Sequence, residues 1–212
     1  MRLIKAVFII VASGLTAQAV FADSLYSFDS VNRTYTNDLP ATLGFLFSVK
    51  NDFTVTSLGW FDDCLNGFQD GHTVRLFDVS GTLLAAATLS PGTVNPLSGS
   101  FRYEAIAPVT LTAGSTYLLA GTTGDSDPYT VSDNFRDFGI DPNFMIAADA
   151  GRYADNAPGF VYPDQHYSDY MVYAGPNLDG LATPEPGSFA LLAVGCAGLM
   201  LRRRIFLRGF SK

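Results

Sequence analysis

Short runs in which apolar and polar residues alternate recur through the middle of this chain, with turn-forming residues between them. In the run that begins at Phe53, Phe53 and Val55 alternate with Thr54 and Thr56. A period of two is the pattern of a half-buried β-strand, and no helical stripe of useful length interrupts it. The sequence therefore predicts an all-β domain. The predicted strands are Leu25–Ser30, Leu43–Val49, Phe53–Phe61, His72–Val79, Thr82–Leu89, Ser100–Ile106, Ser115–Thr122, Phe144–Ala148 and Tyr170–Tyr173.

Turn residues separate these predicted strands at intervals typical of a sandwich. Asp78-Val79-Ser80-Gly81 and Thr112-Ala113-Gly114-Ser115 are both suited to hairpin turns. Many short strands with this spacing favour a two-sheet β-sandwich, jelly-roll-like in topology. A closed barrel is the alternative.

The alternation also assigns side chains to the two faces of each strand. Phe53 and Val55 should point into the core. On the strand that starts at His72, the same parity places His72, Val74 and Leu76 toward the core. The opposite face of that strand carries Thr73, Arg75 and Phe77.

Charge is divided unevenly along the chain, and the division separates three regions. Residues 23–186 hold all 20 acidic side chains but only six of the 13 basic ones. This stretch is long enough for one β-sandwich domain, which we expect over residues 23–182. Nucleic-acid binding is excluded, because phosphate contacts need clustered Lys and Arg that this domain lacks.

Residues 1–22 have the layout of a secretory signal peptide. Arg2 and Lys5 precede an apolar run from Ala6 to Leu15, and small residues follow at alternate positions near Ala19 and Ala22. The apolar run is shorter than the roughly 20 residues that a permanent span needs. We expect cleavage after Ala19 or Ala22. An uncleaved N-terminal anchor is the alternative.

The C-terminal region has a second apolar segment with a basic end. Pro184-Glu185-Pro186 precedes an uncharged stretch from Gly187 to Leu201, and Arg202, Arg203 and Arg204 follow. Fifteen helical residues reach about 22 Å, which is short of a hydrocarbon core of roughly 30 Å. Such a transmembrane helix suits a temporary membrane stop. The arginines would stay in the cytoplasm and leave the acidic domain outside.

Residues 183–212 resemble the PEP-CTERM sorting signal of Gram-negative bacteria, through Pro184, Glu185, Pro186 and the three arginines. The resemblance implies that an exosortase, a membrane enzyme, removes the tail. It also implies an exported protein with an inner-membrane intermediate that ends at the cell surface or in the extracellular matrix of a producer of exopolysaccharide. An ordinary C-terminal anchor behind a proline-rich stalk is the alternative.

Residues 53–122 resemble an uncharacterised β-sandwich module of bacterial secreted and PEP-CTERM proteins. The matching runs are Gly71 to Asp78, Gly81 to Ala85 and Pro108 to Tyr117. The resemblance implies a sandwich displayed outside the cell, related in shape to carbohydrate-binding modules, and carries no catalytic residues. The run from Tyr173 to Leu178 resembles the last strand of such proteins before their sorting signal.

Catalytic patterns are scarce. The chain has two histidines and two glutamates, and no serine stands in a Gly-x-Ser-x-Gly elbow. Asp62, Asp63 or Asp70 with another aspartate would suit a hydrolase, but no spacing selects a pair. We expect that the protein is not an enzyme.

Two groups of loop aspartates are candidate metal ligands, because carboxylates in loops are natural Ca²⁺ ligands. The alternative is that they shape turns and keep a secreted domain soluble. We expect no resident cofactor, and Ca²⁺ is the ion that these loops would accept. The first group is Asp62, Asp63 and Asp70 with Asn66, and the second is Asp125, Asp127, Asp133 and Asp137.

A tyrosine-rich stretch between residues 152 and 173 is the candidate ligand surface. Tyr162 and Tyr167, with Trp60, would offer aromatic faces to sugars. The alternative is that these rings pack over the sandwich. We therefore expect a structural or adhesive protein of an exopolysaccharide or biofilm matrix, or else a carbohydrate-binding module that recognises exopolysaccharide.

Cysteine content adds one expectation. Removal of the tail takes away Cys196 and leaves Cys64 alone. Cys64 would be either a small buried residue, which we favour, or a free thiol able to pair between chains.

Overall fold

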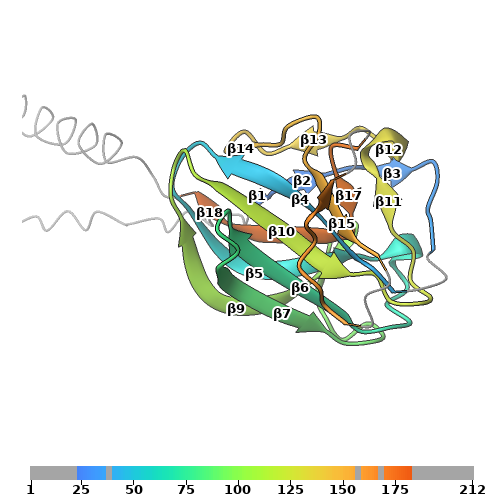
Figure 1. The fold of residues 1–212 in the computed structure, drawn as a ribbon. Coiled ribbons are helices and arrows are strands. Elements are labelled where there is room, and N and C mark those ends of the chain that lie inside the picture. Colours follow the sequence, from blue (N-terminus) through green and yellow to red (C-terminus); the bar gives the residue numbers. More distant parts are fainter. Residues whose placement is uncertain (1–22, 37–39, 156–158, 167–169, 183–212) are drawn as a thin grey trace, which may run out of the picture.

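Two antiparallel sheets facing each other make up the body of the protein (Figure 1). The computed structural model describes residues 23–36, 40–155, 159–166 and 170–182. One sheet, here the β5 sheet, has the strand order β1-β18-β5-β9-β8, and the other, the β4 sheet, has the order β16-β15-β4-β10-β6-β7 with β14 beside β4.

The strands of the β5 sheet are β1 (Asp23–Ser24), β5 (Phe53–Phe61), β8 (Leu97–Ser98), β9 (Phe101–Leu111) and β18 (Pro176–Ala182). Those of the β4 sheet are β4 (Thr42–Val49), β6 (His72–Asp78), β7 (Leu83–Leu89), β10 (Thr116–Thr122), β14 (Phe144–Met145), β15 (Gly151–Ala154) and β16 (Gln165–His166).

Eight of these strands reproduce the jelly-roll order. Strands β1-β18-β5-β9 form one four-stranded set and β4-β10-β6-β7 the other, so the chain crosses between the sheets at most of its connections. This is the double Greek key of a jelly roll. The prediction of a two-sheet, jelly-roll-like β-sandwich is confirmed. Within the described ranges the two sheets share no hydrogen-bonded strand, so the barrel alternative is wrong.

Short paired strands cover one side of the sandwich, at the upper right of Figure 1. They pair as β11 with β17, β12 with β3 and β13 with β2. Their bounds are β2 (Tyr26–Ser27), β3 (Ser30–Val31), β11 (Thr130–Val131), β12 (Phe135–Arg136), β13 (Gly139–Ile140) and β17 (Tyr173–Ala174). Two single-turn 3-10 helices, η1 (Asp63–Leu65) and η2 (Ser132–Asn134), lie in the connecting loops.

The core lies between the sheets and is rich in aromatic rings. Phe53 and Val55 are fully buried, as are Val74 and Leu76, so the predicted face assignment is confirmed. Trp60 fills the centre. Only glycines fit beside its ring, because a Cβ at Gly121 or Gly175 would come within 2.6 Å or 2.2 Å of it. Further rings, including Tyr26, Phe28, Phe101 and Phe135, extend the core beneath the short strands.

Three predicted strands are split or shorter in the structure. The predicted strand Leu25–Ser30 is split between β2 and β3, because its two halves pair with different partners, β13 and β12. The predicted strands Phe144–Ala148 and Tyr170–Tyr173 shrink to the two-residue strands β14 and β17. Alternation sets which face a side chain takes, but only the partner strand sets how far hydrogen bonding continues.

Strand β9 is longer than predicted, and β15 was not predicted. The sequence pattern ended at Ile106, whereas β9 runs on to Leu111 past Pro108. The pairing of β5 with β9 is irregular between Val55 and Ser57, and this irregularity accommodates the proline, which has no N–H to donate. Strand β18 agrees with the resemblance to a last strand before the sorting signal.

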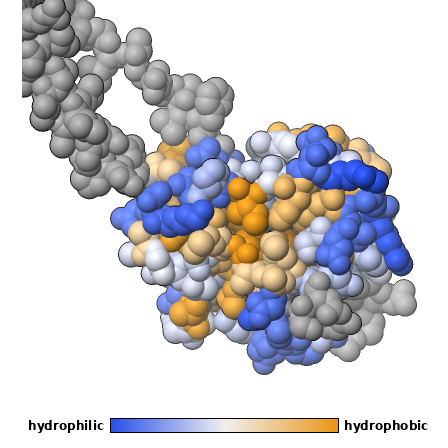
Figure 2. Space-filling view, turned by 90° about the horizontal axis from the view of Figure 1, so that it is seen from above, coloured by the Kyte–Doolittle hydropathy of each residue, from blue (hydrophilic) through white to orange (hydrophobic). Residues whose placement is uncertain are grey.

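An apolar groove of about 200 Å³ lies where β14 runs beside β4, lined in part by Leu46, Met145 and Ala147. Figure 2 shows apolar side chains gathered at the centre of the surface on this side of the molecule. Among the described residues, no helix is long and apolar enough to cross a membrane. The predicted signal peptide 1–22, the C-terminal transmembrane helix and the sorting residues Pro184 to Arg204 lie outside the described residues.

A polar hollow at one end of the sandwich as candidate functional site

Two loops meet at one end of the sandwich, and each holds the other through a carboxylate. The first joins β5 to β6 and the second follows β10. Asp127 of the second loop accepts hydrogen bonds from the backbone N–H groups of Gln69 (2.9 Å) and Asp70 (2.7 Å). In return, Asp70 Oδ2 accepts from the backbone N–H groups of Asp125 (2.9 Å) and Ser126 (2.7 Å). The two loops are therefore joined as one rigid unit.

His72 supports this unit from below. It is fully buried, as its strand parity predicted, and stacks on Trp60 with ring centroids 4.8 Å apart. Its Nδ1 lies 2.9 Å from the carbonyl oxygen of Thr122, and its Nε2 lies 3.1 Å from Asp127 Oδ2. Both partners are hydrogen-bond acceptors, so each of them can accept a ring N–H of His72.

The Asp127 carboxylate is held in its charged form. Burial raises its pKa, but hydrogen bonds from His72, Gln69 and Asp70 outweigh burial and leave the pKa below its ordinary value. Because all these donors occupy the Asp127 oxygens and the side chain is buried, Asp127 acts as a support of the loops rather than as a ligand-binding group.

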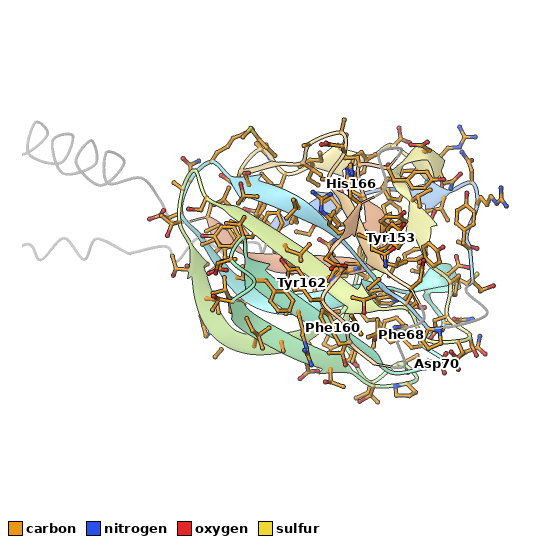
Figure 3. The ribbon with its side chains drawn as sticks, in the orientation of Figure 1. Phe68, Asp70, Tyr153, Phe160, Tyr162 and His166 are labelled. Atoms are coloured by element: carbon orange, nitrogen blue, oxygen red, sulfur yellow. The ribbon has the colours of Figure 1, made fainter. Side chains whose placement is uncertain are left out.

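A hollow of about 370 Å³ lies above these loops. It brings together one member of each group of candidate residues in the sequence: Asp70, Asp125 and Phe160. Figure 3 shows Asp70 at the end of the sandwich, with Phe160 over the nearby sheet face. The remaining lining residues are Pro40, Gly71, Thr73, Thr122, Gly124 and Gly159. Carboxylates, hydroxyls and one aromatic ring therefore share a single concave surface.

The tyrosine-rich segment lies across the outer face of the β4 sheet. Phe160 and Tyr162 contact Phe77 with ring centroids 5.7 Å and 5.2 Å apart. Tyr162 remains 39% exposed, so it has both a packing role and a free surface. Tyr167 lies outside the described residues.

Trp60 is not part of any surface platform. Its ring is fully buried in the core, where it lies between His72 and the two glycines described above. The prediction that it joins an exposed aromatic surface is wrong, because the irregularity in β5 between Val55 and Ser57 shifts the alternation by one residue and turns Trp60 inward.

Asp62 and Asp63 do not join Asp70. Asp62 is buried and pairs with Arg102 at 2.6 Å, while it also accepts from the backbone N–H of Gly67. Asp63 lines a separate hollow of about 320 Å³ beside Cys64. Cys64 is exposed, so the expectation of a buried cysteine is wrong.

Neither predicted aspartate group forms a metal cage in the part of the chain that the structure describes, where no three His, Cys, Asp or Glu side chains are placed to hold an ion. Asp70 and Asp125 come together from different groups, whereas Asp133 lies in η2. Closeness in the chain did not identify the aspartates that come together, because that depends on which loops meet in the fold.

Thr73 and Thr122 were not predicted as site residues. Thr73 is on the outward face of β6, one residue after His72, and Thr122 is the last residue of β10. A signal in the sequence could have indicated them: each is a threonine on the outward face of a strand, at the point where that strand meets a loop that carries candidate aspartates.

These features define the class of protein: a jelly-roll β-sandwich with a polar, partly aromatic hollow built from loops at one end. The chain belongs to the family described as Domain of unknown function (DUF4082), which matches residues 29–173.

A PEP-CTERM protein-sorting motif matches residues 182–204. The resemblance to PEP-CTERM proteins with an uncharacterised sandwich module is thereby confirmed. The motif marks the chain for exosortase-dependent export to the cell surface or extracellular space. No curated protein matches the sequence at the significance required.

Proposed function

We propose that this protein is an adhesive component of an extracellular polysaccharide or biofilm matrix, and that it binds polysaccharide in the hollow between Asp70, Asp125 and Phe160. Export to the cell surface places it where such polymers are found. The observation that carries the proposal is the convergence of carboxylates, hydroxyls and an aromatic ring on one concave surface.

This set of groups matches the chemistry of sugars. Carboxylate and threonine oxygens accept hydrogen bonds from sugar hydroxyls, and an aromatic face packs on the apolar C–H face of the ring. Asp70 is held in place by two backbone N–H groups, so little conformational freedom is lost when a ligand binds. Asp125 is exposed at the rim.

We propose binding rather than catalysis. His72 is fully buried, and Asp127, which is 6% exposed and lines the hollow beside Cys64, has both carboxylate oxygens engaged by Gln69, Asp70 and His72. Asp62, one of the candidate acids of a hydrolase, is engaged by Arg102. We further propose that binding needs no metal ion, because the hollow is lined by only two of the described carboxylates.

Affinity measurements on an array of bacterial and plant polysaccharides test the proposal. Asp125→Asn and Phe160→Ala should each weaken binding by about 10-fold, as expected for central interface groups. Asp164→Asn is the matched control, because Asp164 is exposed on the same segment but does not line the hollow. Binding should be the same in Ca²⁺ and in EDTA.

The opposite results are equally informative. If the protein binds no polysaccharide, the adhesive role fails, and a structural role that depends on location and acidic surface becomes the better hypothesis. Binding that Asp125→Asn and Phe160→Ala leave unchanged would place the ligand elsewhere on the molecule.

A further inference from the structure

Arg75 lies directly beside the hollow. It is the next outward-facing residue after Thr73 on β6, and Thr73 lines the hollow. Its guanidinium carbon lies 4.4 Å from the centroid of the Phe160 ring. Phe160 also lines the hollow, so one aromatic ring belongs both to the hollow and to the contact with the arginine. Figure 3 shows this ring over the β4 sheet, next to Tyr162.

This guanidinium has no acceptor within the described part of the chain. The ion pairs found there use His72, Arg102 and His166. Arg75 Nε is buried and has no hydrogen-bond partner there, a property that it shares only with the indole nitrogen of Trp60, deep in the core. Buried polar donors are normally paired. Arg136 and Arg152 also pair with no described carboxylate, but both donate to other oxygen atoms, and Arg33 is exposed to water. Among the described arginines, Arg75 is therefore the partly buried one whose guanidinium is left for an acceptor from outside.

We infer that Arg75 binds the carboxylate of a uronic acid, so that the ligand of the hollow is a polysaccharide in which uronates alternate with neutral sugars. This inference rests on the function proposed above. A guanidinium presents a planar fork of donors that matches a carboxylate, and stacking on Phe160 holds that fork in one orientation.

The charges around the hollow explain why the polymer must be mixed. Asp70 and Asp125 line the hollow and repel a uronate placed there, so the hollow takes a neutral sugar. Thr73 and Arg75 are two positions apart on the same strand face, which corresponds to about 6.6 Å along the strand. One short stretch of polymer therefore reaches both, with its carboxylate at Arg75.

The test uses the full chain, purified in mild detergent, and two probes that differ in one group. Oligosaccharides of gellan, in which neutral sugars separate the glucuronates, are compared with the same oligosaccharides after reduction of their carboxyl groups. Calorimetry should give at least about 10-fold tighter binding of the native form, because a charge-assisted hydrogen bond is lost on reduction. Polygalacturonate, which carries a carboxylate on every sugar, should bind more weakly than native gellan.

Arginine variants separate charge from geometry. Arg75→Gln should bind native and reduced gellan equally, and Arg75→Lys, which keeps the charge without the fork, should keep only part of the preference. Arg136→Gln is the control, because Arg136 is exposed on β12, away from the hollow, and bonds Asn32, which follows β3. It should keep the full preference. Melting temperatures show whether each variant is folded.

The outcomes distinguish the two proposals. Equal binding of native and reduced gellan by the unchanged protein would overturn the role of Arg75 and leave polysaccharide binding intact. A preference that persists in Arg75→Gln, or that is undiminished in Arg75→Lys, would do the same. If the protein binds neither these probes nor neutral glucans, the proposed function itself fails.

Discussion

The buried ion pair between Arg102 and Asp62 should be a principal source of stability for the loops at the end of the sandwich. Arg102 is 4% exposed and Asp62 is 2% exposed. Arg102 Nε donates to Asp62 Oδ2 at 2.6 Å, and its Nη1 donates to the carbonyl oxygen of Asn95 at 2.9 Å. Longer bonds reach the carbonyl oxygens of Leu65 and Thr93. One side chain thus joins three separate parts of the chain.

Arg102→Met removes every one of these bonds while it keeps much of the side-chain volume. It leaves the Asp62 carboxylate buried without its counterion, a change that costs about 3–5 kcal/mol. In a domain of this size, each kcal/mol corresponds to roughly 2–4 °C in melting temperature, so we expect a decrease of roughly 6–20 °C. Urea and thermal unfolding, followed by circular dichroism, measure both quantities.

A double-mutant cycle separates the pair from its surroundings. Asp62→Asn in the Arg102→Met background should cost less than it does alone, with a coupling energy above about 1 kcal/mol. Arg136→Met, at an exposed arginine with a single hydrogen bond to Asn32, should cost no more than about 0.5 kcal/mol. Additive effects of the two substitutions, or a loss below about 1 kcal/mol for Arg102→Met, would refute the reasoning.

Three further outcomes are expected. Gly175→Ala should destabilise the protein by about 1–3 kcal/mol, because its Cβ would lie 2.2 Å from the buried indole ring, whereas Gly159→Ala, with nothing within 4 Å, should be nearly neutral in urea unfolding. The lowered pKa of Asp127 means that its contribution to stability is present above about pH 4 and is lost as pH falls through the folded-state pKa. Urea unfolding should therefore show the stability deficit of Asp127→Asn at pH 6 shrinking toward pH 2, and a deficit that grows would contradict this sign. Intact mass of the extracellular protein should end near Pro186, and a mass that retains Arg202–Lys212 in the membrane fraction would indicate a true anchor.

Local patterns carried most of the information about the strands. The observed bounds of β5 equal the predicted ones, and β4, β6, β7 and β10 agree to within a residue at each end. Period-two alternation is set by the geometry of the strand itself, so it can be recognised without knowing the partner. The sorting motif is equally local, because it is defined by residue order at one end of the chain.

These local patterns could not predict contacts between side chains that are far apart in the sequence. Asp62, Asp63 and Asp70 are close in sequence, yet Asp62 pairs with Arg102 and Asp70 lies beside Asp125. Which charged side chains meet depends on which loops the two sheets bring together. The conformation of each loop depends in turn on contacts with residues far away in the sequence.

The sequence by itself determined that this protein is an exported, all-β domain with its apolar residues facing inward, because strand parity, charge distribution and terminal signals are local properties. Only the tertiary structure decided that Trp60 is buried, since Gly121 of β10 and Gly175, between β17 and β18, leave room for its ring. It alone also placed Asp70, Asp125 and Phe160 around one hollow. Asp70 and Asp125 meet because β6 and β10 pair antiparallel in the jelly roll, which brings the start of β6 and the end of β10 to the same end of the sandwich. No single stretch of sequence records this pairing.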